Sequence, residues 1–286
     1  MTMDGSFPAG HDGRSLLKDM PSSIKRYRYQ GKEHFFRIKN IELDRFENST
    51  PDSDTEDIVN EYILFEISKP ILERDFLAPD RDGPLFLFSS FDTMQNLLLV
   101  RMTTRKHSQA IEAFGYAIMD QLSRMGLRSI VETFSGTAIK AGASGKQGDH
   151  GWSPLRPPCG YPHHPTVVLE VAVSETKAKL ERDVLFWLDP ERGNANIAIT
   201  LKVNRKKPVI TIQKWEWLYE SPRSTQEIII AEDTTGENIT VSKHPLVIPF
   251  HLLMRRQAST PVESDITIEM ADLKEIAQRI WNVQDF

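Results

Sequence analysis

The 286-residue sequence contains a single cysteine, Cys159, which excludes an internal disulfide and a cysteine-rich zinc site. It has no run near the ~18 apolar residues that a membrane helix needs. Its start, Met-Thr-Met-Asp-Gly-Ser-Phe, lacks the basic and then apolar pattern of a secretory signal. These absences predict a soluble protein of a reducing compartment, the cytoplasm or the nucleus, with no membrane partner.

An excess of positive charge is also missing. Lys and Arg together number 35 against 40 Asp and Glu, so the formal net charge is −5. This balance does not by itself indicate a nucleic-acid-binding protein. It leaves nucleic acid open as a partner, because a basic cleft acts through its local field even in an acidic protein. The 40% of hydrophobic residues is typical of a globular chain with a proper core.

Composition and patterning predict four segments. Residues 1–22 are rich in Gly, Pro, Ser and Asp and suggest a flexible tail, and 23–100 a β-rich N-terminal extension with an acidic exposed loop at 47–57. Residues 101–220 carry the strongest periodic signals and are expected to form the core. Strands and a helix in 221–286 are expected to pack on that core.

The predicted core alternates helices and strands. Its elements are a helix at 107–125, a strand at 128–134, a flexible glycine-rich stretch at 135–148, a buried strand at 165–173, a helix capped by Ser174, and strands at 196–203 and 208–217. The near-continuous apolar run of 165–173 indicates burial on both faces, as at the centre of a sheet. The pattern predicts an α/β (α+β) fold in which helices flank a central mixed sheet, with extra β elements at both ends.

Two carboxylates are the best candidates for chemistry. Asp149 follows the glycine-rich stretch, and Glu170 interrupts the most apolar strand, where an ionised carboxylate is costly unless a partner offsets its desolvation. Carboxylates on neighbouring strands can converge on Mg²⁺, which can activate water and hold a phosphate. The alternative is structural: Glu170 pairs with a nearby Arg or Lys, or faces water from an edge strand.

Three segments of the chain resemble a group of uncharacterised fungal proteins. They are the run Lys146-Gln147-Gly148-Asp149, the strand that holds Glu170, and the helix with Asp183 and Trp187. Through them the chain resembles the PD-(D/E)XK nuclease superfamily, including its bacterial Uma-type members. The resemblance spans roughly residues 95–217. It implies a restriction-endonuclease-like core of helix, three strands, helix and strand, in which Asp149 and Glu170 bind Mg²⁺ beside the scissile phosphate.

The chain departs from the superfamily motif at two positions. Gly148 replaces the proline before Asp149, and Ala172 replaces the lysine expected two residues after the second acid. That lysine stabilises developing charge or positions the attacking water. Lys177 and Lys179 on the next helix, or Lys202 on the next strand, could supply it through their long stems. Otherwise these lysines are solvated and the fold is present without catalysis.

Further candidates surround this pair. The resemblance implies that Glu112, on the first helix, is an additional metal ligand, although a solvated helix face also explains it. The basic residues expected to contact phosphates, if the fold gathers them, are Lys146, Lys202, Arg205 and Lys206. The alternative for them is a charged turn that serves solubility.

The sequence therefore supports three functional hypotheses. The first is a Mg²⁺-dependent phosphodiesterase, that is, a nuclease of the hydrolase class, or a nuclease-like DNA-binding protein. The second is a catalytically inactive interaction domain that keeps the fold. The third is a structural protein in which extra strands at 30–100 and 227–250 build an interface, such as that of a homodimer. Whether the chain is an enzyme, and whether it uses DNA or RNA, stays open at this point.

Overall fold

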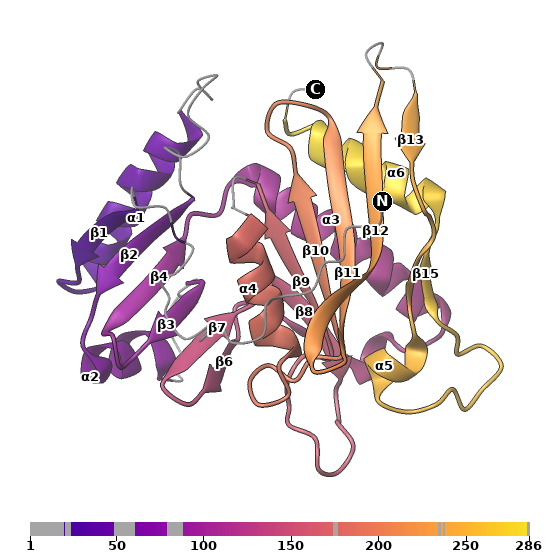
Figure 1. Cartoon of the computed structure of the whole chain (residues 1–286), viewed down its shortest axis with the longest axis horizontal. Coiled ribbons are helices and arrows are strands. Elements are labelled where there is room, and N and C mark those ends of the chain that lie inside the picture. Colours follow the sequence, from indigo (N-terminus) through magenta and orange to yellow (C-terminus); the bar gives the residue numbers. More distant parts are fainter. Residues whose placement is uncertain are drawn as a thin grey trace.

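The computed structural model describes residues 20, 24–48, 61–78, 88–173, 177–233, 236 and 238–284. The predicted tail at 1–22, the predicted loop at 47–57 and the helix cap at Ser174 fall mostly or wholly outside these residues. Two sheets stand side by side, the smaller built mainly from the N-terminal part and the larger from the rest (Figure 1). In the described part of the chain, no helix has the length and apolar character needed to cross a membrane.

The larger sheet has seven strands in the order β13-β12-β11-β10-β9-β8-β5. Only β9 and β10 pair in parallel, so the sheet is mixed. Its strands are β5 (Val131–Phe134), β8 (His150–Pro154), β9 (Val167–Ala172), β10 (Ile197–Val203), β11 (Val209–Leu218), β12 (Ser221–Glu232) and β13 (Ile239–Val241). Helix α4 (Lys177–Leu188) covers one face, while α3 (Arg105–Arg124) and α6 (Met270–Trp281) cover the other (Figure 1). The predicted mixed sheet flanked by helices is confirmed.

Strand β9 lies in the interior of this sheet, next to the central strand β10, and is buried along its whole length, as predicted. The side chains of Val167, Leu169 and Val171 point to one face and pack in the main core beneath α3 and α6. Val168, on the opposite face, packs with Val184 of α4. Because strand side chains alternate, Glu170 shares the face of Val168 and points toward α4. Each apolar side chain buried here contributes about 1.5–3 kcal/mol to folding.

The smaller sheet has the order β1-β2-β4-β3-β7-β6. Its strands are β1 (Lys25–Arg28), β2 (Tyr62–Glu66), β3 (Ser90–Asp92), β4 (Leu97–Arg101), β6 (Ala138–Ala141) and β7 (Ser144–Gln147). The short helix α2 (Lys69–Leu72) continues into the π-helical turn η1 (Glu73–Leu77). The sheet is therefore shared between the predicted extension at 23–100 and the predicted core at 101–220.

One prediction in this region is wrong. Residues 34–43 alternate locally and suggest strands, but they belong to the helix α1 (Lys32–Glu47). The buried or partly buried side chains Phe35, Ile38, Glu42 and Phe46 are spaced by three or four positions. Over the whole segment this helical period outweighs the short alternation, so the extension is a mixed α/β layer and not purely β-rich.

The predicted flexible stretch at 135–148 is also wrong, because it forms the hairpin β6–β7. Ala141 pairs with Ser144, and Gly142, with a φ of 61°, provides the left-handed position that a two-residue turn needs. The hairpin is inserted between β5 and β8 and joins the smaller sheet through β3. Without the hairpin, the order of elements is α3, β5, β8, β9, α4 and β10. This is the order of helix, three strands, helix and strand that the resemblance implies.

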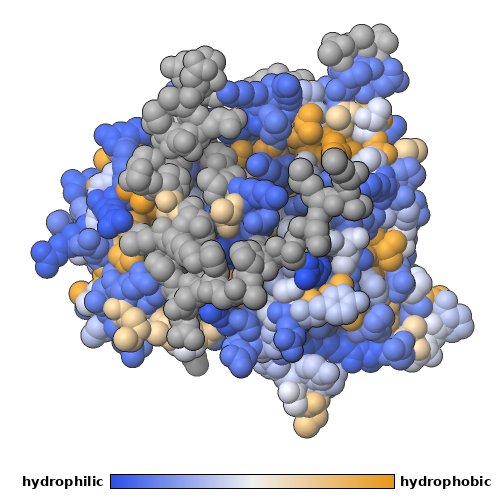
Figure 2. Space-filling view, in the orientation of Figure 1, coloured by the Kyte–Doolittle hydropathy of each residue, from blue (hydrophilic) through white to orange (hydrophobic). Residues whose placement is uncertain are grey.

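The described residues of segment 221–286 add two strands to the larger sheet and a helix that covers it. After β12 and β13, a two-stranded sheet, β14 (Leu246–Ile248) with β15 (Ile266–Ile268), flanks the short helix α5 (Phe250–Met254) and precedes α6. Glu269 and Asp272 form a capping box at the start of α6. Figure 2 shows a mostly hydrophilic face with smaller hydrophobic groups between the polar side chains.

Candidate functional site

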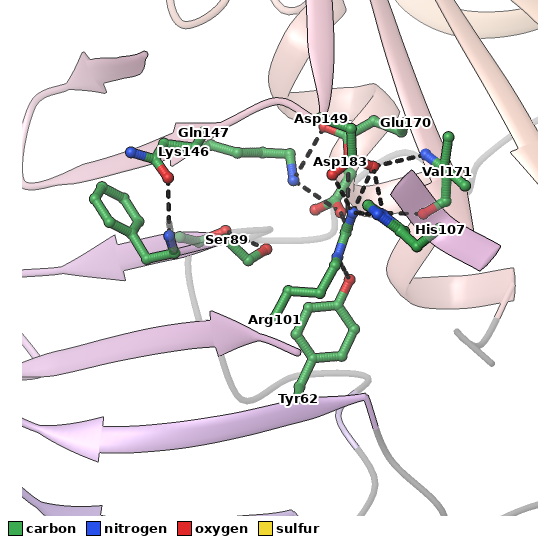
Figure 3. A network of polar contacts seen from close by, with 12 residues as sticks. Tyr62, Ser89, Arg101, His107, Lys146, Gln147, Asp149, Glu170, Val171 and Asp183 are labelled. Atoms are coloured by element: carbon green, nitrogen blue, oxygen red, sulfur yellow. Dashed lines mark hydrogen bonds and ion pairs between the residues drawn. The ribbon is translucent and has the colours of Figure 1, made fainter. Parts of the chain in front are cut away.

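The two predicted acids come together at the junction of the two sheets (Figure 3). Asp149 directly precedes β8, whose first residue, His150, pairs with Leu169 of β9. That register places Asp149 beside Glu170 on the adjacent strand. The ends of β4 and β7 from the smaller sheet reach the same point and bring Arg101 and Lys146 with them.

Asp149 is held by contacts from three different elements. Its carboxylate accepts a hydrogen bond from the backbone N–H of Val171, at 2.7 Å. Arg101 Nη1 contacts both of its oxygens, and His107 Nε2 on α3 lies 3.2 Å from Oδ2. Burial alone raises the pKa of Asp149, but the charge of Arg101 and the contact with His107 outweigh it and hold that pKa well below its usual range. Asp149 is therefore an anion at neutral pH.

Arg101 bridges the two acids. Its guanidinium is 6% exposed, and its Nη2 lies 3.5 Å from Glu170 Oε2 while Nη1 contacts Asp149. Nη1 also lies 3.4 Å from the backbone oxygen of Val171. Its Nε donates to the hydroxyl of Tyr62, at 2.8 Å, which fixes the guanidinium against β2. Asp183 Oδ2 lies 3.9 Å from Nη2, so oxygens from three carboxylates and one carbonyl converge on a single positive group.

Glu170 is fully buried and ion-paired. Its Oε1 lies 3.2 Å from Lys146 Nζ and accepts a hydrogen bond from Trp187 Nε1. Burial is the main cause that raises the pKa of Glu170 to about 7, and the attraction of Lys146 only partly opposes it. The negative charges of Asp149 and Asp183 raise that pKa further. The ion-pair interpretation of Glu170 is thus correct, and the carboxylate also lies beside the second predicted acid.

Asp183 is a member of this cluster to which the sequence assigned no role. It lies on α4, and its Oδ2 is 2.9 Å from Lys146 Nζ and in contact with Lys179 Nζ. Burial raises the pKa of Asp183, but these two lysines lower it to about 2. Lys179, Asp183 and Trp187 recur every four residues, so they form one polar stripe on an otherwise apolar helix face. That periodicity was the available signal.

The lysines proposed to replace the motif lysine at Ala172 differ in whether they reach the cluster. Lys179 is buried and reaches the cluster through Asp183. Lys177 does not, because its side chain is 80% exposed and pairs with Glu181 on the same helix. Lys202 is exposed and stands beside Ala172 in the register of β9 and β10. The lysine that contacts Glu170 is Lys146, which the motif comparison did not propose for this role.

The predicted phosphate contacts do not form one surface at the site. Lys146 is 2% exposed and ion-paired with Glu170, so its role as a phosphate contact stays a prediction. Arg205 lies over the ring of Phe46 on α1, 5.2 Å from its centroid. Lys206 is exposed in the turn between β10 and β11. The exposure of Lys202 and Lys206 leaves their role as phosphate contacts a prediction.

A cavity of about 460 Å³ opens beside Asp149. His107 and Glu112 line it from α3, and His150 lines it from β8. The polar groups that line this cavity with Asp149 thus include two histidine rings, a carboxylate and the Arg101 guanidinium. Glu112 is exposed in this cavity, and no contact joins it to Asp149 or Glu170. Its prediction as an additional metal ligand is not supported by this arrangement.

The oxygen atoms at the site match the ligands that Mg²⁺ prefers. Asp149, Glu170 and the carbonyl of Val171 surround the Arg101 guanidinium, which takes the place of a cation. Among the described residues, no three Asp, Glu, His or Cys side chains are arranged to hold a metal ion. As they stand, these oxygens contact the Arg101 guanidinium and not a metal ion.

Comparison with known proteins adds little to this geometry. No protein-family model matches the chain, and no curated protein matches it. One similar solved structure is a proposed nuclease belonging to DUF820 from Anabaena variabilis. The two chains are 12% identical with a TM-score of 0.36, over 67% of this chain and 90% of the other. The function proposed below rests on the geometry of the site itself.

Proposed function

We propose that this chain is a nuclease-like protein of the PD-(D/E)XK type, in which Asp149 and Glu170 bind Mg²⁺ and phosphodiester bonds of nucleic acid are cleaved. The observation that carries the proposal is the convergence of both carboxylates and the Val171 carbonyl on the Arg101 guanidinium. Such a set of hard oxygen donors, aimed at one positive charge, is suited to a divalent cation.

The chain's own residues have separate roles in this proposal. Asp149, Glu170 and the Val171 carbonyl provide the ligands after Arg101 has withdrawn. A bound Mg²⁺ would supply Lewis-acid stabilisation of the phosphate and a more acidic water. Arg101, once displaced, remains close enough to pair with a phosphate oxygen as it now pairs with carboxylates.

Lys146 fits the role of the lysine that is missing at Ala172. It approaches Glu170 from β7, at 3.2 Å, and its charge lies inside the cluster. A lysine ammonium there can stabilise charge that develops on a reacting phosphate, because the surrounding burial strengthens its field. Lys179 would then serve mainly to neutralise Asp183. Lys146, on the inserted hairpin, would then perform the role that the motif lysine on the strand of the second acid performs in the superfamily.

One observation favours the second candidate, an inactive interaction domain, whether for another protein or for a homodimer. The three buried anions Asp149, Glu170 and Asp183 are matched by three cations, Arg101, Lys146 and Lys179. A buried network that is balanced in this way is self-sufficient and can be purely structural. The two candidates differ in whether Arg101 yields to a metal ion.

Calorimetric titration with Mg²⁺ and Mn²⁺, together with cleavage assays on single- and double-stranded DNA and RNA, tests the proposal. Wild type should bind the metal and cleave at least one substrate. Asp149→Asn should lose both properties, and Lys177→Ala, a variant of an exposed residue on α4, should keep both. If wild type neither binds the metal nor cleaves any substrate, and so behaves like Asp149→Asn in every assay, the chain is an interaction domain and not a nuclease.

A further inference from the structure

The cavity beside Asp149 is formed largely by one face of α3. The positions of this helix that line it are spaced by three and four residues: Ser108, Ile111, Glu112, Gly115, Tyr116 and Met119. The end of β5 and the start of β8 complete the opposite wall with Thr133, Ser135 and His150. This face of α3 therefore borders an open space, and Ile111 and Met119 on it also pack against the main core.

Gly115 keeps that space open. A Cβ built at this position would meet no atom within 4 Å, and its φ lies outside the left-handed region that would demand glycine. A glycine in a helix interior costs about 1 kcal/mol relative to alanine. Neither close packing nor backbone conformation accounts for glycine here, whereas a larger side chain would project into the cavity.

The walls combine flat or apolar groups with a few hydrogen-bonding groups. Phe88, Ile111, Tyr116 and Met119 supply apolar and aromatic surface. Glu112, Thr133 and Ser135 supply acceptors and donors. The volume, about 460 Å³, lies within the range of about 300–1,000 Å³ of pockets that hold one small molecule or one part of a larger one.

We infer that this cavity takes one unpaired nucleotide of a single-stranded nucleic acid, which deepens the proposed function and rests on it. The base would lie against Tyr116 and Met119, and Glu112 would accept a hydrogen bond from an exocyclic amino group. Its phosphate would then face the end of the cavity where Asp149 and His107 lie. A paired base in a duplex cannot enter such a space unless it is flipped out of the stack.

The test measures binding of fluorescently labelled oligonucleotides by anisotropy in EDTA, so that cleavage does not interfere. The probes are a single-stranded DNA, its blunt duplex and the RNA of the same sequence. The variant Gly115→Trp fills the cavity, and the matched control Gly115→Ala adds one methyl group to open space. Tyr116→Ala, at a residue that is 61% exposed, removes the stacking surface and, with it, the contact of the ring with the Arg279 guanidinium of α6.

The inference predicts that wild type binds a single strand at least about fivefold more tightly than the duplex, since stacking one base is worth ~1–3 kcal/mol. Gly115→Trp and Tyr116→Ala should lose this preference, and Gly115→Ala should keep it. Equal affinity of wild type for strand and duplex, or an unchanged preference in Tyr116→Ala, overturns the inference. Comparison of the single-stranded DNA and RNA probes identifies which of the two nucleic acids the cavity binds.

Failure of this inference is distinguishable from failure of the proposed function. If metal-dependent cleavage occurs on duplex DNA and is unaffected by Gly115→Trp, the cavity inference is wrong and the nuclease proposal stands. If single strands bind through the cavity but no metal-dependent cleavage occurs with any substrate, the cavity inference stands and the nuclease proposal is wrong.

Discussion

The side chains of Lys146 and Glu170 join the two sheets of the protein. Lys146 Nζ, from β7 of the smaller sheet, lies 3.2 Å from Glu170 Oε1, on β9 of the larger sheet. Both side chains are almost completely buried. This ion pair therefore does two things: it offsets the desolvation of Glu170, and it links the inserted hairpin to the core.

Lys146→Met should be strongly destabilising. It leaves the anions of the cluster with two of their three cations, and removing one partner of a buried ion pair costs about 3–5 kcal/mol. The measurement is the free energy of unfolding from urea denaturation at neutral pH. Lys177→Met is the matched control, because its exposed pair with Glu181 is worth about 0–1 kcal/mol. Equal stability of the two variants would contradict a structural role for Lys146.

Glu170 should make the protein less stable as pH rises through its titration range. Burial raises its pKa from 4.5 to about 7, so between these values the folded chain holds a proton that the unfolded chain has released. Stability due to Glu170 is therefore fully present below about pH 4.5 and lost as pH rises to about 7, a change on the order of 3 kcal/mol.

The measurement is the free energy of unfolding of wild type and Glu170→Gln across pH 4.5 to 8. The variant has no proton to release at this position, so its curve should fall less steeply over that window. Parallel curves would show that Glu170 has an ordinary pKa. A variant that is destabilised by about 3–5 kcal/mol at every pH would show that Glu170 acts as an ion-pair partner in its charged form.

Gly145→Ala should destabilise the hairpin β6–β7. A Cβ at Gly145 would lie 2.5 Å from two ring carbons of Phe91 and 2.8 Å from the backbone oxygen of Ile139. Relief of this overlap needs a shift of the strand, which costs about 1–3 kcal/mol. Gly115→Ala, the comparison variant, should instead raise the melting temperature. If both alanine variants melted at the same temperature as wild type, the packing of β7 against β3 would be wrong.

The central sheet was predictable because its signals are local. The apolar run of β9 and the helical period of α3 each lie within one segment, and both elements appear at the predicted positions within two residues. Asp149 and Glu170 were paired through the resemblance to the PD-(D/E)XK superfamily, because the sequence pattern predicted no strand at 150–154, where the structure has β8. Their adjacency follows from the antiparallel pairing of β8 with β9.

The cations of the site were not predictable in the same way. Arg101 ends a strand of the smaller sheet. Lys146 lies in the hairpin β6–β7, whose glycine-rich sequence led to the prediction of a flexible stretch. Their contacts depend on how one sheet packs against the other, and no spacing within the sequence encodes that relation. Lys177, by contrast, was an attractive candidate only by proximity in sequence, and the turn of α4 directs it to solvent.

The central claim is that the position now taken by the Arg101 guanidinium can hold a divalent cation. The variant Arg101→Gln removes the guanidinium and leaves Asp149 and Glu170 without their shared positive partner, so it should melt below wild type. A metal ion bound between the carboxylates would restore that charge. Binding to the folded state alone raises stability by mass action, about 2.7 kcal/mol at a hundredfold excess over the dissociation constant.

The most direct measurement is therefore the melting temperature of Arg101→Gln as a function of Mn²⁺ concentration, with Arg101→Gln/Asp149→Asn as the matched control. We predict that Mn²⁺ raises the melting temperature of the single variant in a saturable way and leaves that of the double variant unchanged. An Arg101→Gln protein whose melting temperature does not respond to Mn²⁺, or responds equally with and without the Asp149 carboxylate, would contradict the account.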